Sequence, residues 1–129
     1  MEKEYTLKKA EAIHREDVEG LKKLSFYEDK LRVLEERLWE LTCKYTSFEL
    51  RDRIADFREE IMMKHHEANE MKAAFTEEEF ETVYKLERLK ERAGLGLQKA
   101  RELHERMGYF QKEVKELWVR VNDFLSLWM

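Results

Sequence analysis

Apolar side chains recur at alternating intervals of three and four residues in the stretch from Leu24 to Phe48. This heptad spacing holds for about four heptads and predicts a long helix that packs lengthwise against other helices. The pattern continues more weakly toward the N-terminus, past Gly20, so we expect the first helix over about residues 8–45. Gly20 either softens this helix or lets another helix approach closely. The apolar positions are Leu24, Tyr27, Leu31, Leu34, Leu38, Leu41, Tyr45 and Phe48.

The segment Thr46-Ser47-Phe48-Glu49 matches a capping box, a sequence typical of the start of a helix. Thr46 is the expected N-cap residue, and the carboxylate of Glu49 is expected to return to its backbone amide. We therefore predict a turn here and a second helix over about residues 47–92, to which Phe48 belongs. Its apolar row consists of Leu50, Ile54, Phe57, Ile61, Ala68, Met71 and Phe75, with Lys64 as the one polar residue in the row.

The most regular apolar row lies in the last part of the chain and predicts a third helix over about residues 96–128. A second row at its side widens the apolar face. The main row consists of Ala100, Leu103, Met107, Phe110, Val114, Leu117, Val121, Phe124 and Trp128. The flanking row consists of Leu97, His104, Gln111, Trp118 and Leu125.

Two sites compete for the second turn of the chain. Gly94 and Gly96 place two glycines within three residues, which favours a left-handed helix end. Thr76 begins a second T-x-x-E sequence, but a turn there alone would leave the last helix overhanging its neighbours by roughly 30 Å. We therefore predict an elongated antiparallel three-helix bundle with its turn at Gly94–Gly96 and with Thr76 inside the second helix. A four-helix bundle that turns at both sites is the alternative.

Composition fits a thin core shared by long helices. The 129 residues predict one domain over residues 1–129; 42% are charged, and the chain has four glycines and no proline. The net charge is −4, and acidic and basic residues are intermixed, which favours solvated helix faces over nucleic-acid binding. A single cysteine, Cys43, indicates a reducing, cytoplasmic setting. No apolar run reaches the roughly 20 residues of a membrane span.

Several segments resemble a family of small uncharacterised bacterial helical proteins. These segments are 44–50 at the predicted first turn, 24–29 within the first helix, and 115–117 and 124–129 in the last helix. The resemblance implies three long helices with a break before the last one. It also implies a bacterial cytosolic origin, and it implies no catalytic activity.

A metal site is the alternative function that the sequence raises. Ferritin-like bundles bind two metal ions through a glutamate from each of two helices and Glu-x-x-His from two others. Hemerythrin-like use of histidine and glutamate is a related case. The chain has one Glu-x-x-His sequence, Glu11 to His14. The other candidate ligands are His65, His66, Glu70 and His104.

No sequence pattern points to catalysis. Cys43 has only Lys44 as a cationic neighbour in the sequence and lacks a nearby base. The pair Gly94 and Gly96 has neither a strand before it nor a third glycine, so it does not form a nucleotide-binding fingerprint. We expect no enzyme activity and no cofactor.

The C-terminal helix carries more apolar side chains than one small bundle is expected to bury. Trp118, Phe124, Leu125 and Trp128 are the predicted interaction residues. A surplus of this kind is typical of a protein interface. We therefore expect a protein-protein interaction or scaffold module that docks a protein partner or forms a homodimer through this helix.

Overall fold

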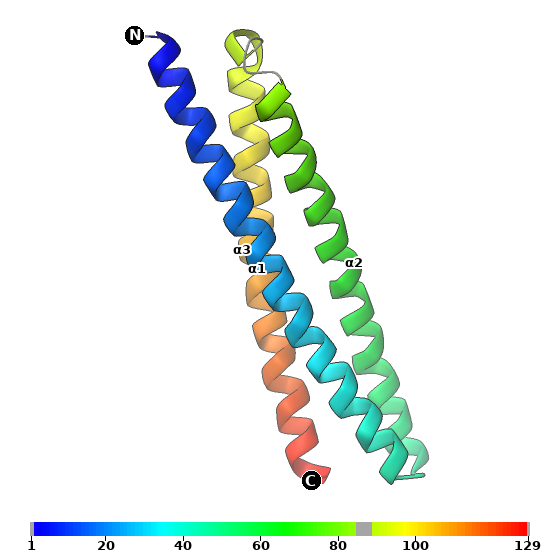
Figure 1. The fold of residues 1–129 in the computed structure, drawn as a ribbon. Coiled ribbons are helices and arrows are strands. Elements are labelled where there is room, and N and C mark those ends of the chain that lie inside the picture. The colour runs from blue at the N-terminus through cyan, green and yellow to red at the C-terminus, as the bar shows by residue number, and fades with distance from the viewer. Residues whose placement is uncertain (1, 85–88, 129) are drawn as a thin grey trace.

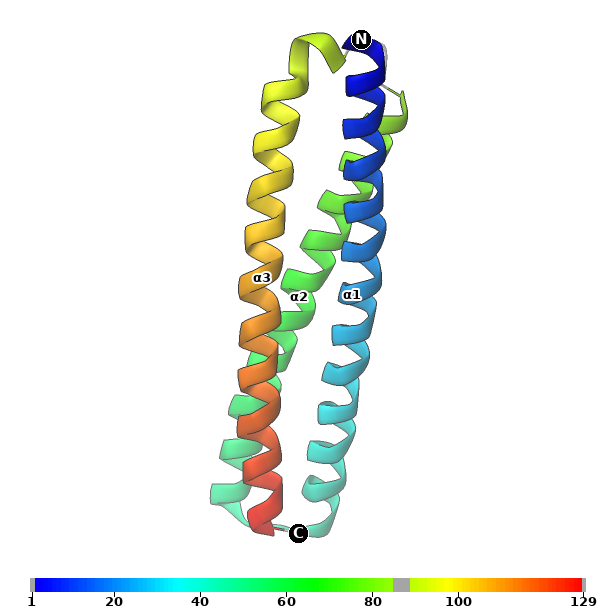
Figure 2. The same cartoon turned by 90° about the vertical axis from the view of Figure 1, so that its left-hand side faces the viewer.

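The protein is an elongated bundle of three long α-helices. The computed structural model describes the backbone of residues 2–84 and 89–128, and the side-chain surroundings of residues 11–12, 14–77 and 101–128. The helices are α1 (Glu2–Lys44), α2 (Phe48–Tyr84) and α3 (Leu89–Trp128). Figure 1 shows α2 running antiparallel to α1 and α3. Figure 2 shows α1 and α3 side by side. The predicted fold class is confirmed.

The predicted heptad rows form the core, except at the end of the bundle where Tyr45 and Trp128 are each 38% exposed. In α1 the leucines from Leu24 to Leu41 are fully buried, and Tyr27 packs edge-on against Phe110 of α3. Phe48 is instead 84% exposed, so it contributes to the core of neither helix. The buried residues of α2 are Leu50, Ile54, Phe57, Ile61, Ala68, Met71 and Phe75. Those of α3 are Leu103, Met107, Phe110, Val114, Leu117, Val121, Phe124 and Leu125.

The predicted turn at Gly94–Gly96 is wrong. α2 ends at Tyr84 and α3 begins at Leu89, so both glycines lie inside α3. A glycine ends a helix by adopting a left-handed conformation, and no residue in the described part of the chain has a positive φ. A glycine in a helix interior costs only about 1 kcal/mol relative to alanine, which packing can offset. The predicted boundary between the helices 47–92 and 96–128 therefore lies too late in the chain.

The four-helix alternative is also wrong, because α2 continues through Thr76. The Thr76 hydroxyl donates a hydrogen bond of 2.8 Å to the carbonyl of Lys72 one turn earlier, so it does not cap a new helix. The resulting helices have 43, 37 and 40 residues. At about 1.5 Å per residue their lengths are similar, so each helix covers the others along most of the bundle.

The second helix begins one residue later than predicted. The Arg51 amide donates to the carbonyl of Ser47 at 3.1 Å, which is the first hydrogen bond of α2. Ser47 therefore holds the N-cap position that the capping-box pattern assigned to Thr46. The turn itself is confirmed, since α1 ends at Lys44 and α2 starts at Phe48.

Candidate interaction site

Three of the four interaction residues predicted on α3 pack against other residues of the bundle. Phe124 and Leu125 are only 6% and 4% exposed, and Phe124 packs against Phe57 of α2 with ring centroids 5.2 Å apart. Trp118 is half-buried, with the cations of Lys30 and Arg37 from α1 over its ring. These three side chains therefore have partners within the chain.

Trp128 lies at the end of the bundle, next to the turn between α1 and α2. The Tyr45 hydroxyl donates to the carbonyl of Trp128 at 3.1 Å, and the two rings meet edge-on with centroids 5.7 Å apart. Phe48 and Leu127 are both exposed. The pair of Tyr45 and Trp128 therefore ties the last turn of α3 to the start of the connection that follows α1.

The candidate metal ligands do not converge. Glu11 and His14 lie in the N-terminal part of α1, and His104 lies in α3 beside Gly20 and Phe75. Among the side chains that the structure describes, no three histidine, cysteine or acidic groups are placed to hold a metal ion.

The two adjacent histidines of α2 point in different directions. His65 Nε2 lies 3.1 Å from Glu35 Oε1 of α1, whereas the exposed His66 lies 2.9 Å from Glu70 Oε1 on its own helix. Glu70 in turn accepts a hydrogen bond of 2.5 Å from Arg106 of α3. Each histidine thus has a carboxylate partner, His65 on α1 and His66 on its own helix.

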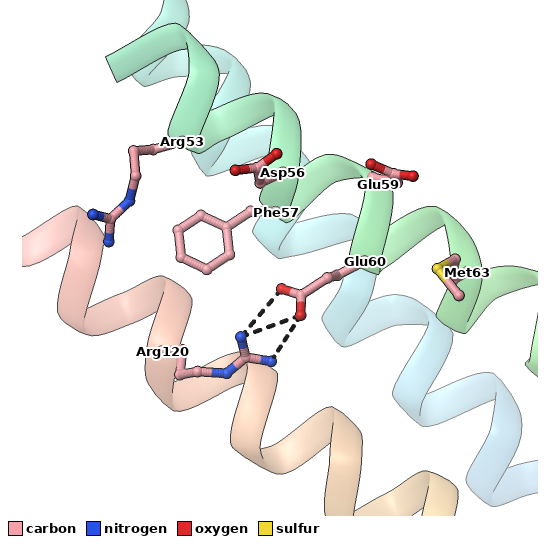
Figure 3. A pocket seen from close by; sticks show the side chains of 7 residues that line it. All are labelled: Arg53, Asp56, Phe57, Glu59, Glu60, Met63 and Arg120. Atoms are coloured by element: carbon pink, nitrogen blue, oxygen red, sulfur yellow. Dashed lines mark hydrogen bonds and ion pairs between the residues drawn. The ribbon is translucent and has the colours of Figure 1, made fainter. Parts of the chain in front are cut away.

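Among the described side chains, three ion pairs of alternating sign join α2 to α3. Going along α2, Glu60 pairs with Arg120, Lys64 with Glu113, and Glu70 with Arg106. Figure 3 shows the first pair, in which the Arg120 guanidinium donates to both oxygens of Glu60 at 3.2 Å. The α3 partners are seven residues apart, so a shift of α3 by one heptad would bring like charges together. The pairs therefore favour one antiparallel register.

The ion pairs also shift two pKa values. The hydrogen bond from Arg106, together with the nearby charges of His66 and Arg106, holds the pKa of Glu70 below its ordinary value of 4.5. For Lys64, burial acts to lower the pKa, but the hydrogen bonds to Glu113 and Glu67 and the charges of these carboxylates prevail. The pKa of Lys64 is therefore raised above its ordinary value of 10.5. Both shifts favour the charged forms of these groups.

A groove between α1 and α2 is lined by two apolar side chains that the bundle leaves exposed. Trp39 of α1 is 59% exposed and Met62 of α2 is 69% exposed, and both line this groove. The groove has a volume of about 460 Å³. The other lining residues are Glu35, Glu36, Glu40, Arg58 and His65.

Sequence reasoning missed Trp39. This residue follows Leu38 directly and therefore lies outside the heptad row that packs into the core. A tryptophan at a solvent-facing helix position was the available signal, because tryptophan is enriched among the residues that contribute most to binding at protein interfaces. Met62 gave no comparable signal, since it could be assigned to the groove only once the register between α1 and α2 was known.

Comparisons with protein-family models, curated proteins and solved structures gave no match to this chain. The resemblance to small bacterial helical proteins is thus supported in its architecture of three long helices, and the family itself is not established. In the described residues, no helix carries an apolar segment long enough to cross a membrane.

Proposed function

We propose that the chain is a non-enzymatic interaction module that binds an α-helix of a protein partner in the groove between α1 and α2. The observation that carries this proposal is the pair of exposed apolar side chains, Trp39 and Met62, in one groove. Amphipathic helices bind in such grooves by inserting a few anchor side chains. The reducing, cytoplasmic setting inferred from the lone Cys43 belongs to the same proposal.

The two side chains have complementary properties for this task. Tryptophan is among the residues most enriched at the centres of protein interfaces, because it buries a large area while fixing only two side-chain torsions. Methionine is flexible and polarisable, so it adapts to partner side chains of different shape. Trp39 supplies the rigid wall of the groove and Met62 the adaptable one.

The charges around the groove define the partner further. Three carboxylates, those of Glu35, Glu36 and Glu40, line it from α1. The opposing charge on α2 is Arg58, with His65 already at 3.1 Å from Glu35. The excess of carboxylates favours a partner helix with an apolar face flanked by lysine or arginine.

Tryptophan fluorescence provides the first test. In a variant with Trp118→Phe and Trp128→Phe, Trp39 is the single reporter, and the probe is a helical peptide of about four heptads with a leucine face flanked by arginines. We expect the emission of Trp39 to shift to shorter wavelength on binding. In the wild-type background, Trp39→Ala should weaken binding of the peptide by about tenfold or more.

A neighbouring residue supplies the matched control. Met63 is 60% exposed, close to the exposure of Met62, but it lines the groove between α2 and α3 (Figure 3). Met62→Ala should weaken binding of the peptide and Met63→Ala should not. Equal binding by wild type and Trp39→Ala would contradict the proposal, as would a dimer seen by sedimentation that Trp39→Ala dissociates, since the groove would then hold a second copy of this chain.

A further inference from the structure

Four cations form a row along one edge of α1. Lys23, Lys30, Arg37 and Lys44 are spaced seven residues apart, and they cover about 31 Å at 1.5 Å per residue. The contacts of Lys30 and Arg37 with Trp118 place this row, here called the basic row, on the side of α1 that faces α3. The groove between α1 and α2 lies on the other side of α1, where Glu35 meets His65.

The basic row lacks the ion pairs that join the other helices. α1 is joined to α2 by Glu28 with Lys72 at 2.7 Å, and α2 is joined to α3 by its three alternating pairs. Within the described residues, by contrast, no member of the basic row forms an ion pair with a carboxylate. The row therefore carries positive charge that the bundle itself leaves unneutralised.

The opposite face on α3 is uncharged or basic. Arg37 donates a hydrogen bond of 2.6 Å to the Asn122 side chain, and Lys30 lies over the rings of Trp118 and Phe26 at 5.2 and 4.9 Å. Asn122 and Trp118 share their side of α3 with Lys115, since the three follow at steps of three and four. At these positions α3 thus adds a cation and no acid.

Acidic groups lie near both ends of the basic row, and Glu16, Asp17 and Glu19 line the same pocket as Lys23. Glu40 lies between Arg37 and Lys44, one turn of helix from Lys44, and Glu19 lies one turn before Lys23. Two exposed apolar side chains of α1, Phe26 and Val33, accompany the row, and Phe26 is 55% exposed. The surface therefore combines regularly spaced positive charge with an apolar strip.

We propose that a second partner helix, acidic and amphipathic, binds along the basic row, on the side of α1 that faces α3. Its carboxylates would recur every seven residues and meet Lys23, Lys30, Arg37 and Lys44, and its apolar face would cover Phe26 and Val33. The heptad repeat is the observation that selects a helix, because cations about 10.5 Å apart match a helix with the same repeat.

Other anionic partners fit the surface less well. Phosphates of one nucleic-acid strand follow at about 3.4 Å along the axis, which a row spaced at about three times that distance would engage only in part. Glu40 would also oppose a continuous line of phosphates. A membrane surface needs an apolar face that inserts into it, and Phe26 and Val33 alone supply little. The inference does not depend on the groove that contains Trp39, because it concerns the opposite edge of α1.

Binding of a designed peptide tests the proposal. The probe is a helix of about four heptads with a leucine face flanked by glutamates, compared with the same helix flanked by lysines. In a Trp39→Ala background, which removes the anchor of the groove between α1 and α2, we expect the acidic peptide to bind at least tenfold more tightly than the basic one. The double variant Lys30→Gln with Arg37→Gln should lose about tenfold in affinity for the acidic peptide.

A second double variant provides the control for charge and fold. Lys22→Gln with Arg32→Gln removes the same charge from α1 outside the basic row, so it should change the affinity less than twofold. Helix content measured by circular dichroism checks that each variant folds. In the same Trp39→Ala background, a charge-reversed variant, Lys30→Glu with Arg37→Glu, should prefer the lysine-flanked peptide, which a merely structural role of these residues would not produce.

Three results would overturn the proposal. The first is equal loss of affinity in the two glutamine variants. The second is failure of the charge-reversed variant to exchange its preference. The third is binding of a single-stranded oligonucleotide, or of vesicles containing an anionic phospholipid, that is tighter than binding of the acidic peptide and depends on Lys30 and Arg37.

Discussion

A Cβ atom on Gly20 would lie 2.6 Å from Cζ of Phe75, closer than such atoms approach in proteins. Phe75 is buried, so its ring fills the space that a side chain on α1 would otherwise occupy. Of the two roles expected for Gly20, the close approach of another helix is therefore the one that the structure has. Gly20 lets α2 pack directly against the backbone of α1 at this level.

Replacing Gly20 by alanine should destabilise the bundle. Alanine favours the helix by about 1 kcal/mol, but overpacking against a buried ring costs about 1–3 kcal/mol, so we expect a net loss of about 1 kcal/mol. Urea denaturation of Gly20→Ala measures this loss. In a Phe75→Leu background the ring is absent and the same substitution should stabilise the protein, which a double-mutant cycle would detect.

Gly108 provides a control of opposite sign. A Cβ atom there would meet no atom within 4 Å. Gly108→Ala should therefore gain only the helix preference, up to about 1 kcal/mol of stability. Destabilisation by Gly108→Ala equal to that of Gly20→Ala would show that the contact with Phe75 is not the cause.

Exchanging the charges of Glu60 and Arg120 should leave the bundle nearly as stable as wild type. Each single reversal, Glu60→Arg or Arg120→Glu, places like charges side by side and should cost about 1 kcal/mol, since both side chains are partly exposed. The double reversal restores an attractive pair. Chemical denaturation at low and high salt tests this, and additive losses in the double variant would indicate that the pair does not couple.

The free energy of unfolding should decrease as the pH is lowered, and Glu70 should account for part of this decrease. Because Arg106 lowers the pKa of Glu70 in the folded chain, this carboxylate contributes its stability fully above about pH 4.5, and the contribution is lost as the pH falls through the lowered value. Glu70→Gln should flatten the decrease of stability in this acid range. Glu59→Gln, which removes an exposed carboxylate without an ion pair among the described residues, should leave the decrease unchanged.

Lys64 should be replaceable by an apolar residue. It occupies a position of the core row of α2, and its side chain is only 15% exposed. Lys64→Met should be neutral or stabilising by up to about 2 kcal/mol, because a half-buried ion pair is exchanged for apolar packing. Glu113→Gln, which leaves Lys64 charged with Glu67 as its remaining partner, should instead cost about 1 kcal/mol in thermal or urea unfolding.

The heptad rows could be predicted because burial depends on the spacing of apolar residues. Every leucine of the predicted row from Leu24 to Leu41 is buried, and the row of α3 from Leu103 to Phe124 is buried as well. The second turn could not be found in this way. Glycine marks a helix end only when its backbone leaves the helical region, and the neighbours of Gly94 and Gly96 do not reveal this choice.

The candidate site was less predictable than the fold, since it depends on pairs of helices. Trp39 is visible as a tryptophan outside the core row, but Met62 joins it only through the register of α1 and α2. The seven-residue spacing of Lys23, Lys30, Arg37 and Lys44 is present in the sequence. It is difficult to recognise there because glutamates are intermixed with these cations. That no ion pair with a carboxylate is found for the row among the described residues is clear only from the structure, which places Lys30 and Arg37 opposite Trp118 and Asn122.

Site-specific photo-crosslinking in the cells that contain the protein tests the proposed function most directly. A photoreactive phenylalanine analogue replaces Met62 in one variant and Met63 in the other, so that two neighbouring exposed positions report on different grooves. Mass spectrometry of the crosslinked peptides identifies the segment captured at each position.

We predict that position 62 captures a discrete amphipathic helical segment rich in lysine or arginine, that Trp39→Ala abolishes this crosslink, and that position 63 does not capture the same segment. Capture of the same segments at both positions, or a crosslink at position 62 that persists in Trp39→Ala, would contradict a partner helix bound in the groove between α1 and α2.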